Sequence, residues 1–272
     1  MKLRLKNYTN SKAFIFYSLL IFPFIIIAQP SLETLVKNIN YRQIGPTRQG
    51  GRVVAFTVSQ QDPFTFYMAG GPGGVWKTDN NGNTFYPIFE NEDISSVGDI
   101  ALAPSNDSIL WIGTGEANLR NSTYYGNGVY KSLDAGLTWE HMGLKESHHI
   151  GRVLIHPKNP DIVYVAAQGH YYSENPERGI YKTIDGGKTW EKSLDIKINN
   201  RHIGATEIKM DKSNPNVLYA VTYDRIRTPW MFKNNGEGSR IYKSSDGGES
   251  WKKLTKGLPS GSLGKIGIDI YD

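Results

Sequence analysis

The sequence predicts an all-β fold, a β-propeller built of four-stranded blades. Three observations predict it: a turn pattern that recurs four times, short apolar runs between those turns, and many glycine and aromatic residues. The chain has 29 glycines, 16 tyrosines and 6 tryptophans among 272 residues, and these residue types favour turns and strands. A helical solenoid would require a 3.6-residue apolar period, and none is found after Gln43.

The chain begins with the features of a secretory signal peptide, residues 1–28. Four basic residues precede the apolar run Ala13–Ala28, and this order is typical of a cleaved leader. The alternative, a membrane anchor, needs about 20 apolar residues, whereas Pro23 interrupts this shorter run. We therefore expect cleavage after Ala28, no stable membrane span afterwards, and an extracytoplasmic location, either periplasmic or secreted.

Charge and cysteine content exclude several function classes. The formal net charge of +5 falls to about +1 once the four basic leader residues are removed, so no basic face for nucleic acid is indicated. The chain has no Cys, which excludes disulfides, thiolate metal sites and a Cys nucleophile. A leader combined with no cysteine indicates an exported bacterial protein held together by its core.

The repeat is marked by one polar turn residue in each unit. The spacings between these markers are 54, 51 and 61 residues, which suits four short strands with their turns. Each first strand follows a glycine, and each second strand carries a large aromatic residue. The markers are Asn80, Asp134, Asp185 and Asp246, the glycines are Gly51, Gly98, Gly151 and Gly204, and the aromatic residues are Tyr67, Trp111, Tyr164 and Tyr219.

The turn between the third and fourth strands has the clearest pattern, as in "YKTIDGGKTW" from Tyr181. Asp185 can accept hydrogen bonds from N–H groups of its own turn, Gly187 permits a backbone angle that a Cβ resists, and Trp190 can bury its ring between sheets. We interpret these turns as structural rather than catalytic. The positions given this role are Asn80, Gly82, Asp134, Gly136, Trp139, Asp185, Gly187, Trp190, Asp246, Gly248 and Trp251.

The turn pattern S/T-x-D/N-x-G-x-T/S-aromatic resembles the Asp box, or BNR repeat, of sialidase-like propellers. With "GPTRQGGRV" ahead of the first unit and "GTGE" in the second, the chain from about Tyr41 to Tyr271 resembles bacterial exported proteins grouped with the sortilin N-terminal propeller. These proteins are often labelled glycosyl hydrolase-like. The resemblance implies the fold, but receptors, assembly factors, sialidases and xyloglucan-degrading enzymes all carry the box.

The units give a domain plan. It comprises a signal peptide (1–28), a lead-in that could supply a closing strand (29–45), blade one (46–90), blade two (91–145), blade three (146–196), blade four (197–260) and the first strand of a truncated fifth blade (261–272). An open propeller end exposes an unpaired sheet face. We therefore expect an incomplete front portion of a larger propeller, with self-association only if the chain is naturally this short.

Candidate ligand residues gather in the loops that precede the first strands and in those that join the second and third strands. In a propeller these loops share one face around the central channel, opposite the Asp boxes. Their aromatic, amide, carboxylate and guanidinium groups suit a protein, peptide or glycan partner. The candidates are Arg52, Asp99, Glu116, Asn118, Arg120, His148, His149, Arg152, His170 and His202.

The alternative function is glycoside hydrolysis of an extracellular polysaccharide, which needs two carboxyl groups across the scissile bond. Asp99 and Glu116 are the best-placed candidates, and Glu174, Glu207 and Asp224 are also available. No Arg-Ile-Pro tripeptide of sialidases occurs. The resemblance to xyloglucan-degrading enzymes places a catalytic Asp after the second strand of the first unit, where "YMAGGPGGVW" has no carboxylate.

We expect no cofactor and no metal site. His148 and His149 are adjacent rather than four residues apart on a helix, and no nearby carboxylate is expected to complete a zinc site. The run "GGPGG" from Gly70 lacks the Lys of a phosphate-binding loop.

Overall fold

The structure, a computed structural model, describes Lys37 and residues 51–271. The chain divides between Thr47 and Arg48, and all the described strands belong to the second unit, Arg48–Asp272. The predicted signal peptide and lead-in, residues 1–45, lie outside the described residues except for Lys37, which is helical. No helix in the described part of the chain is long and apolar enough to cross a membrane.

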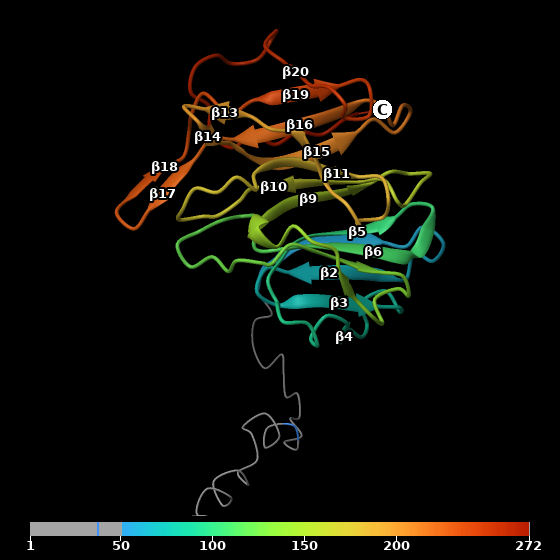
Figure 1. Cartoon of the computed structure of the whole chain (residues 1–272). Coiled ribbons are helices and arrows are strands. Elements are labelled where there is room, and N and C mark those ends of the chain that lie inside the picture. Colours follow the sequence, from blue (N-terminus) through green and yellow to red (C-terminus); the bar gives the residue numbers. More distant parts are fainter. Residues whose placement is uncertain (1–36, 38–50, 272) are drawn as a thin grey trace, which may run out of the picture. The chain divides into compact units, whose positions relative to one another are not determined.

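The second unit confirms the all-β prediction, with four sheets of four antiparallel strands that follow one another along the chain (Figure 1). The first sheet has β1 (Val53–Val58), β2 (Phe66–Gly70), β3 (Gly74–Thr78) and β4 (Tyr86–Pro87), and the second has β5 (Val97–Ala103), β6 (Asn106–Thr114), β7 (Val129–Ser132) and β8 (Glu140–His141). The third has β9 (Ile150–Ile155), β10 (Val163–Ala167), β11 (Gly179–Thr183) and β12 (Glu191–Leu194), and the fourth has β15 (Gly204–Met210), β16 (Leu218–Tyr223), β19 (Ile241–Ser244) and β20 (Lys252–Lys253).

Three further elements lie in the connections between these strands. They are the 3-10 helix η2 (Lys145–Ser147) and two hairpins, β13 (Lys197–Ile198) with β14 (Arg201–His202), and β17 (Ile226–Thr228) with β18 (Met231–Lys233). Neither hairpin was predicted from the sequence. Asn199 and Asn200 connect β13 to β14 with φ of 51° and 63°, the left-handed angles that a two-residue hairpin turn requires.

The sheets pack face to face in chain order. The first strand of each sheet contacts the first strand of the next, β1 with β5, β5 with β9 and β9 with β15. Each of the three apolar clusters combines residues of two successive sheets, and Trp111 and Tyr164 are fully buried in the second and third clusters. Burial of such large rings removes apolar surface from water and is the main force that holds neighbouring sheets together.

A lysine of the third strand covers the aromatic residue of the second strand in all four sheets. The two residues are direct cross-strand partners, and the lysine Nζ lies 5.3–5.9 Å from the ring centroid. A cation at this distance is attracted by the ring face. The pairs are Lys77 with Tyr67, Lys131 with Trp111, Lys182 with Tyr164 and Lys243 with Tyr219.

The sequence from residue 261 onward was expected to form the first strand of a fifth blade. Residues 264–271 form no strand, and the nearby Leu263 makes an isolated bridge to Gly236. The first strand of a blade pairs with its second strand, and no partner of that kind is present among the described residues. Asp269 instead forms an ion pair with Lys209 of β15 at 3.2 Å.

Candidate functional site

Asp99, predicted as a ligand or catalytic residue, lies on β5 and is buried. Its carboxylate accepts a hydrogen bond from the Val153 N–H at 2.8 Å and another from Arg152 Nη1 at 3.2 Å. Burial raises the pKa of Asp99 to about 6, although the neighbouring Arg152 opposes this shift. The side chain therefore links the first strands of the second and third sheets.

Arg152 continues this link to the fourth sheet. Its Nε donates to Glu207 Oε1 at 2.6 Å, and its Nη2 donates to Glu207 Oε2 at 3.2 Å. Burial disfavours the charged guanidinium, but Asp99 and Glu207 outweigh this effect and raise the Arg152 pKa. One guanidinium thus connects carboxylates on β5 and β15, the innermost strands of two other sheets.

Glu116 organises the long loop between β6 and β7. Its Oε2 accepts hydrogen bonds from Thr123 Oγ1 at 2.8 Å and from the Tyr124 N–H at 3.1 Å. Guanidinium groups of Arg52 and Arg120 lie 3.7 and 3.5 Å from Oε1, and this buried oxygen has no hydrogen-bond partner among the described residues. Glu116 is buried while both arginines are exposed.

A pocket of about 370 Å³ lies beside these ion pairs. Its lining includes Asn118, Arg152, Glu207 and Lys265, and the Lys265 Nζ donates to Asn118 Oδ1 at 2.6 Å. Arg52 reaches the same loop through a hydrogen bond from its Nη2 to the Asn118 carbonyl at 3.3 Å. The pocket therefore combines amide, guanidinium, ammonium and carboxylate groups from several segments.

Two of the predicted histidines lie away from this pocket lining. His149 is buried, and its pKa is lowered to about 3 by burial and by nearby Arg225, so the imidazole is neutral within the fold. His202 Nδ1 lies 2.6 Å from Asp195 Oδ1. Each of these two residues interacts with its own local partners.

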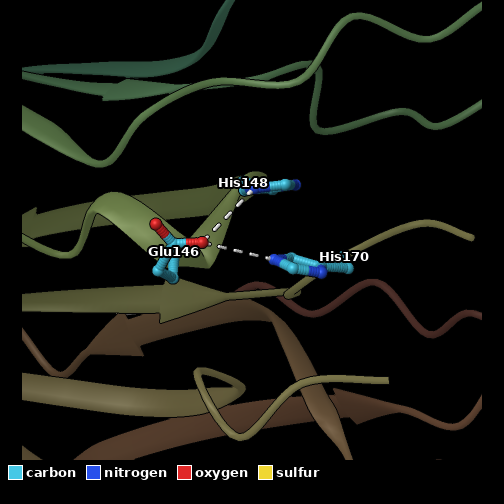
Figure 2. A group of neighbouring side chains, drawn as sticks. All are labelled: Glu146, His148 and His170. Atoms are coloured by element: carbon cyan, nitrogen blue, oxygen red, sulfur yellow. Dashed lines mark ion pairs between the residues drawn. The ribbon is translucent and has the colours of Figure 1, made fainter. Parts of the chain in front are cut away.

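His148 and His170 form a separate cluster with Glu146 (Figure 2). Both histidine Nε2 atoms lie 3.9 Å from Glu146 Oε2, and the two imidazole rings stack with centroids 3.7 Å apart. Contrary to the expectation that no carboxylate would lie near the histidines, Glu146 lies beside His148 and His170. Glu146 lies only two residues before His148, in a 3-10 turn. Helical zinc sites have ligands four residues apart, so that spacing did not point to this pair.

The Asp-box residues lie in the turns between the third and fourth strands. In each turn a glycine N–H donates to the Ser or Thr hydroxyl that ends the third strand, at 2.8–2.9 Å. The marker oxygen accepts the N–H of the residue four positions later, at 2.9–3.0 Å. These turns and the loops of the pocket are at opposite ends of the third strands.

Three residues that were not leading candidates from the sequence are central in the structure. Glu207 was considered only as an available carboxylate, Lys265 was not among the candidate ligand residues, and Glu146 was not considered. Lys265 follows Gly264 as Arg152 follows Gly151, which is the signal that could have identified it. No comparable signal existed for the pairing of Glu207 with Arg152.

The sheets and their charged inner strands define the class of protein, a β-propeller built of four-stranded repeat units. Within this class, the chain belongs to the Sortilin-Vps10 family. The family model, described as "Sortilin, neurotensin receptor 3", matches residues 127–263, about half of the chain. The chain is also similar to the vacuolar protein sorting/targeting protein 10 of Colletotrichum graminicola, which is 28% identical over 88 residues, 32% of this chain and 5% of that protein.

Xyloglucanases share the fold over a longer stretch. Xyloglucanase Xgh74A of Acetivibrio thermocellus is 23% identical over 240 residues, which cover 80% of this chain and 27% of that enzyme. The GH74 xyloglucanase from Xanthomonas campestris superposes with a TM-score of 0.55 at 17% identity, over 74% of this chain and 29% of the enzyme. The Niastella koreensis GH74 enzyme superposes with a TM-score of 0.53 at 22% identity, over 74% of this chain and 30% of that enzyme. The chain thus spans about a quarter to a third of these relatives.

Proposed function

We propose that this chain is part of an exported bacterial β-propeller with Asp-box blades, and that it binds a protein, peptide or glycan on its loop-rich face. The observation that carries the proposal is the pocket lined by Asn118, Arg152, Glu207 and Lys265. The leader sequence of residues 1–28 supports export followed by an extracytoplasmic location. Membership in the Sortilin-Vps10 family fits a binding role.

The charge distribution around the pocket indicates what kind of ligand it favours. Arg52, Arg120 and Arg152 have side chains that are 54%, 46% and 34% exposed, whereas Asp99 and Glu116 are only 3% and 1% exposed. The cations therefore face solvent while the carboxylates are turned inward and paired. A ligand rich in acceptor oxygens, such as a peptide carboxylate or glycan hydroxyl groups, is complementary to this face.

Calorimetric titration of the chain with acidic peptides and with xyloglucan oligosaccharides tests the proposal. We expect binding by one of these ligand classes, and Arg120→Ala should weaken it by about tenfold, the effect of losing a charge-assisted contact worth about 1.5 kcal/mol. Lys188→Ala, in an exposed Asp-box turn at the other end of its strands, is the matched control. Equal affinities of the two variants would contradict binding on the loop-rich face.

Glycoside hydrolysis remains the second candidate because of one observation. The chain is 23% identical to a xyloglucanase over 80% of its length, and Asp99, whose pKa burial raises to about 6, is the carboxyl group to test first. If the chain contributes to a hydrolase, xyloglucan should release reducing ends in its presence, and Asp99→Asn should abolish the release. Binding of xyloglucan without any release of reducing ends would exclude hydrolysis while leaving the binding proposal intact.

A further inference from the structure

A carboxylate and two imidazoles converge where two loops meet. Glu146 belongs to η2, His148 directly follows η2, and His170 lies in the loop after β10. One ligand atom from each residue can be chosen so that all three lie within 4.8 Å of one another. Figure 2 shows both imidazoles directed toward the Glu146 carboxylate. We propose that Glu146, His148 and His170 bind a divalent transition-metal ion, Zn²⁺ in the first instance.

The backbone around the cluster is held in a specific arrangement. The Asn175 side chain accepts the His170 N–H at 2.8 Å and donates to the Glu146 carbonyl at 2.9 Å, so one amide joins both loops. His148 has φ of 52°, a left-handed angle that costs a non-glycine residue about 1–3 kcal/mol and is concentrated at ligand sites. The loops are therefore positioned before any ion arrives.

The orientation of His170 is the one required of a metal ligand. Its Nδ1 lies 2.8 Å from Ser173 Oγ, and its Nε2 is buried with no hydrogen-bond partner among the described residues. Metal-binding histidines typically hold their second nitrogen in such an outer hydrogen bond, which fixes the tautomer and the ring orientation. The unpartnered Nε2 is the atom that faces Glu146 Oε2 at 3.9 Å.

The ligand set indicates which ion is bound. Two imidazoles and one carboxylate suit Zn²⁺, and three protein ligands leave one position of a tetrahedron open to solvent or to a further ligand. Bonds of about 2.0–2.1 Å place two zinc ligands about 3.3 Å apart. The Glu146 side chain is 60% exposed, so its carboxylate can rotate to close the difference from the observed 3.9 Å.

The test uses the purified chain, titrated with Zn²⁺ by calorimetry and with Co²⁺ by visible absorption. We expect one ion per chain and a Co²⁺ ligand-field spectrum with nitrogen and oxygen donors. His148→Ala and His170→Ala should each weaken Zn²⁺ binding by at least about 100-fold, and Ser173→Ala by about tenfold, as outer partners of metal ligands do. Glu146→Gln should also weaken Zn²⁺ binding. Because this position is exposed, the variant should fold and can replace a histidine variant that does not.

His202→Ala is the matched control, because His202 also contacts a carboxylate, that of Asp195, but lacks a second imidazole. Its Zn²⁺ affinity should equal that of the unmodified chain. The proposal is overturned if no Zn²⁺ binds, or if binding is unchanged in Glu146→Gln and in the His148→Ala/His170→Ala double variant with native circular dichroism. Because the cluster is separate from the pocket at Arg152, this outcome leaves the proposed binding function untouched.

Discussion

At the scale of single residues, the Asp-box turns show how one side chain organises a tight reversal. Asp185 Oδ1 accepts the Thr189 N–H at 3.0 Å, and its Oδ2 accepts the Thr189 hydroxyl at 2.6 Å. In the first unit the marker is Asn80, whose Oδ1 accepts the Thr84 N–H and whose Nδ2 donates to the Thr84 hydroxyl. An Asn side chain therefore forms the same two hydrogen bonds as Asp without a charge. The Thr hydroxyl donates to the Asp carboxylate but accepts from the Asn amide.

This difference predicts a pH effect on stability. Hydrogen bonds from Thr138 hold the pKa of Asp134 at about 2, and similar donors lower the pKa of Asp185 and of Asp246. Because these folded pKa values lie below the unfolded value of about 3.9, the carboxylates stabilise the fold above that value, and the contribution is lost as the pH falls through the folded pKa.

We therefore expect the free energy of unfolding to decline between about pH 5 and pH 2. In the variant with Asp134→Asn, Asp185→Asn and Asp246→Asn together, this decline should be shallower, since amides do not titrate. Urea denaturation at a series of pH values measures both curves. An equally steep decline in the triple variant would show that other carboxylates cause the acid sensitivity.

At the scale of the strand, the first strand of each sheet is irregular near the charged pocket. The register with the second strand shifts between Val97 and Asp99 in β5 and between Ala205 and Glu207 in β15. A β-bulge of this kind redirects a side chain. Gly98 allows the irregular part of β5 to pack closely against β9, because a Cβ there would lie 2.1 Å from the Ile150 carbonyl oxygen of β9.

Gly98→Ala should therefore separate β5 from β9 and disturb Asp99, the next residue. We expect a loss of about 1–3 kcal/mol in the free energy of unfolding, the usual cost of overpacking, measured by urea denaturation. Gly267→Ala is the control, since a Cβ there would meet no described atom within 4 Å and should change stability by less than about 0.5 kcal/mol. If Gly98→Ala and Gly267→Ala have equal free energies of unfolding, β5 and β9 can move apart without loss of stability.

At the scale of the whole propeller unit, tryptophan side chains connect each sheet to the one before it. Trp139 Nε1 donates to the Ile88 carbonyl and Trp190 Nε1 to the Met142 carbonyl, each at 2.6 Å. Trp251 Nε1 donates to Ser193 Oγ at 2.9 Å. Each acceptor lies in or directly after the fourth strand of the preceding sheet. These bonds therefore connect neighbouring sheets at their fourth strands, whereas the ion pairs of Arg152 connect them at their first strands.

Trp190→Phe keeps an aromatic ring but removes the donor to Met142. Because the Met142 carbonyl loses its partner, we expect about 1–3 kcal/mol of destabilisation. Amide hydrogen exchange should show reduced protection in both the second and third sheets. Trp230→Phe, at a residue that is 84% exposed, should leave exchange unchanged. Loss of protection confined to the third sheet would mean that the bond does not couple the sheets.

The strands and turns could be predicted from the sequence because each is encoded within a few residues. The short apolar run in "GIYKT" and the Asp–Gly turn after it both depend on neighbours along the chain. The site was predictable only in part. Asp99, Glu116 and Arg152 were identified by their place in the repeat, whereas the contact of Arg152 with Glu207 joins residues of different sheets and depends on the bulges.

The β13–β14 hairpin and the Glu146 cluster were not predicted, because the sequence pattern for each is short. Asn199 and Asn200 are a two-residue turn that connects β13 to β14, yet the strands are too short for an alternating pattern. The Glu146 cluster needed two loops to meet, and the position of His170 is set by the Asn175 amide rather than by any period.

The repeated contacts between sheets have a consequence for the order of the units. The outer contacts are similar at the three boundaries but not identical. Tyr67 and Tyr164 donate to carbonyls of the next turn, whereas Trp111 Nε1 has no hydrogen-bond partner among the described residues. A tryptophan bonds back to the previous sheet at each boundary. Because these contacts resemble one another, they do little to fix the order of the units. The inner ion pairs differ, because Asp99, Arg152 and Glu207 occur once each and match only in this succession. The order of the second, third and fourth units is therefore specified more strongly by their inner strands than by their outer edges.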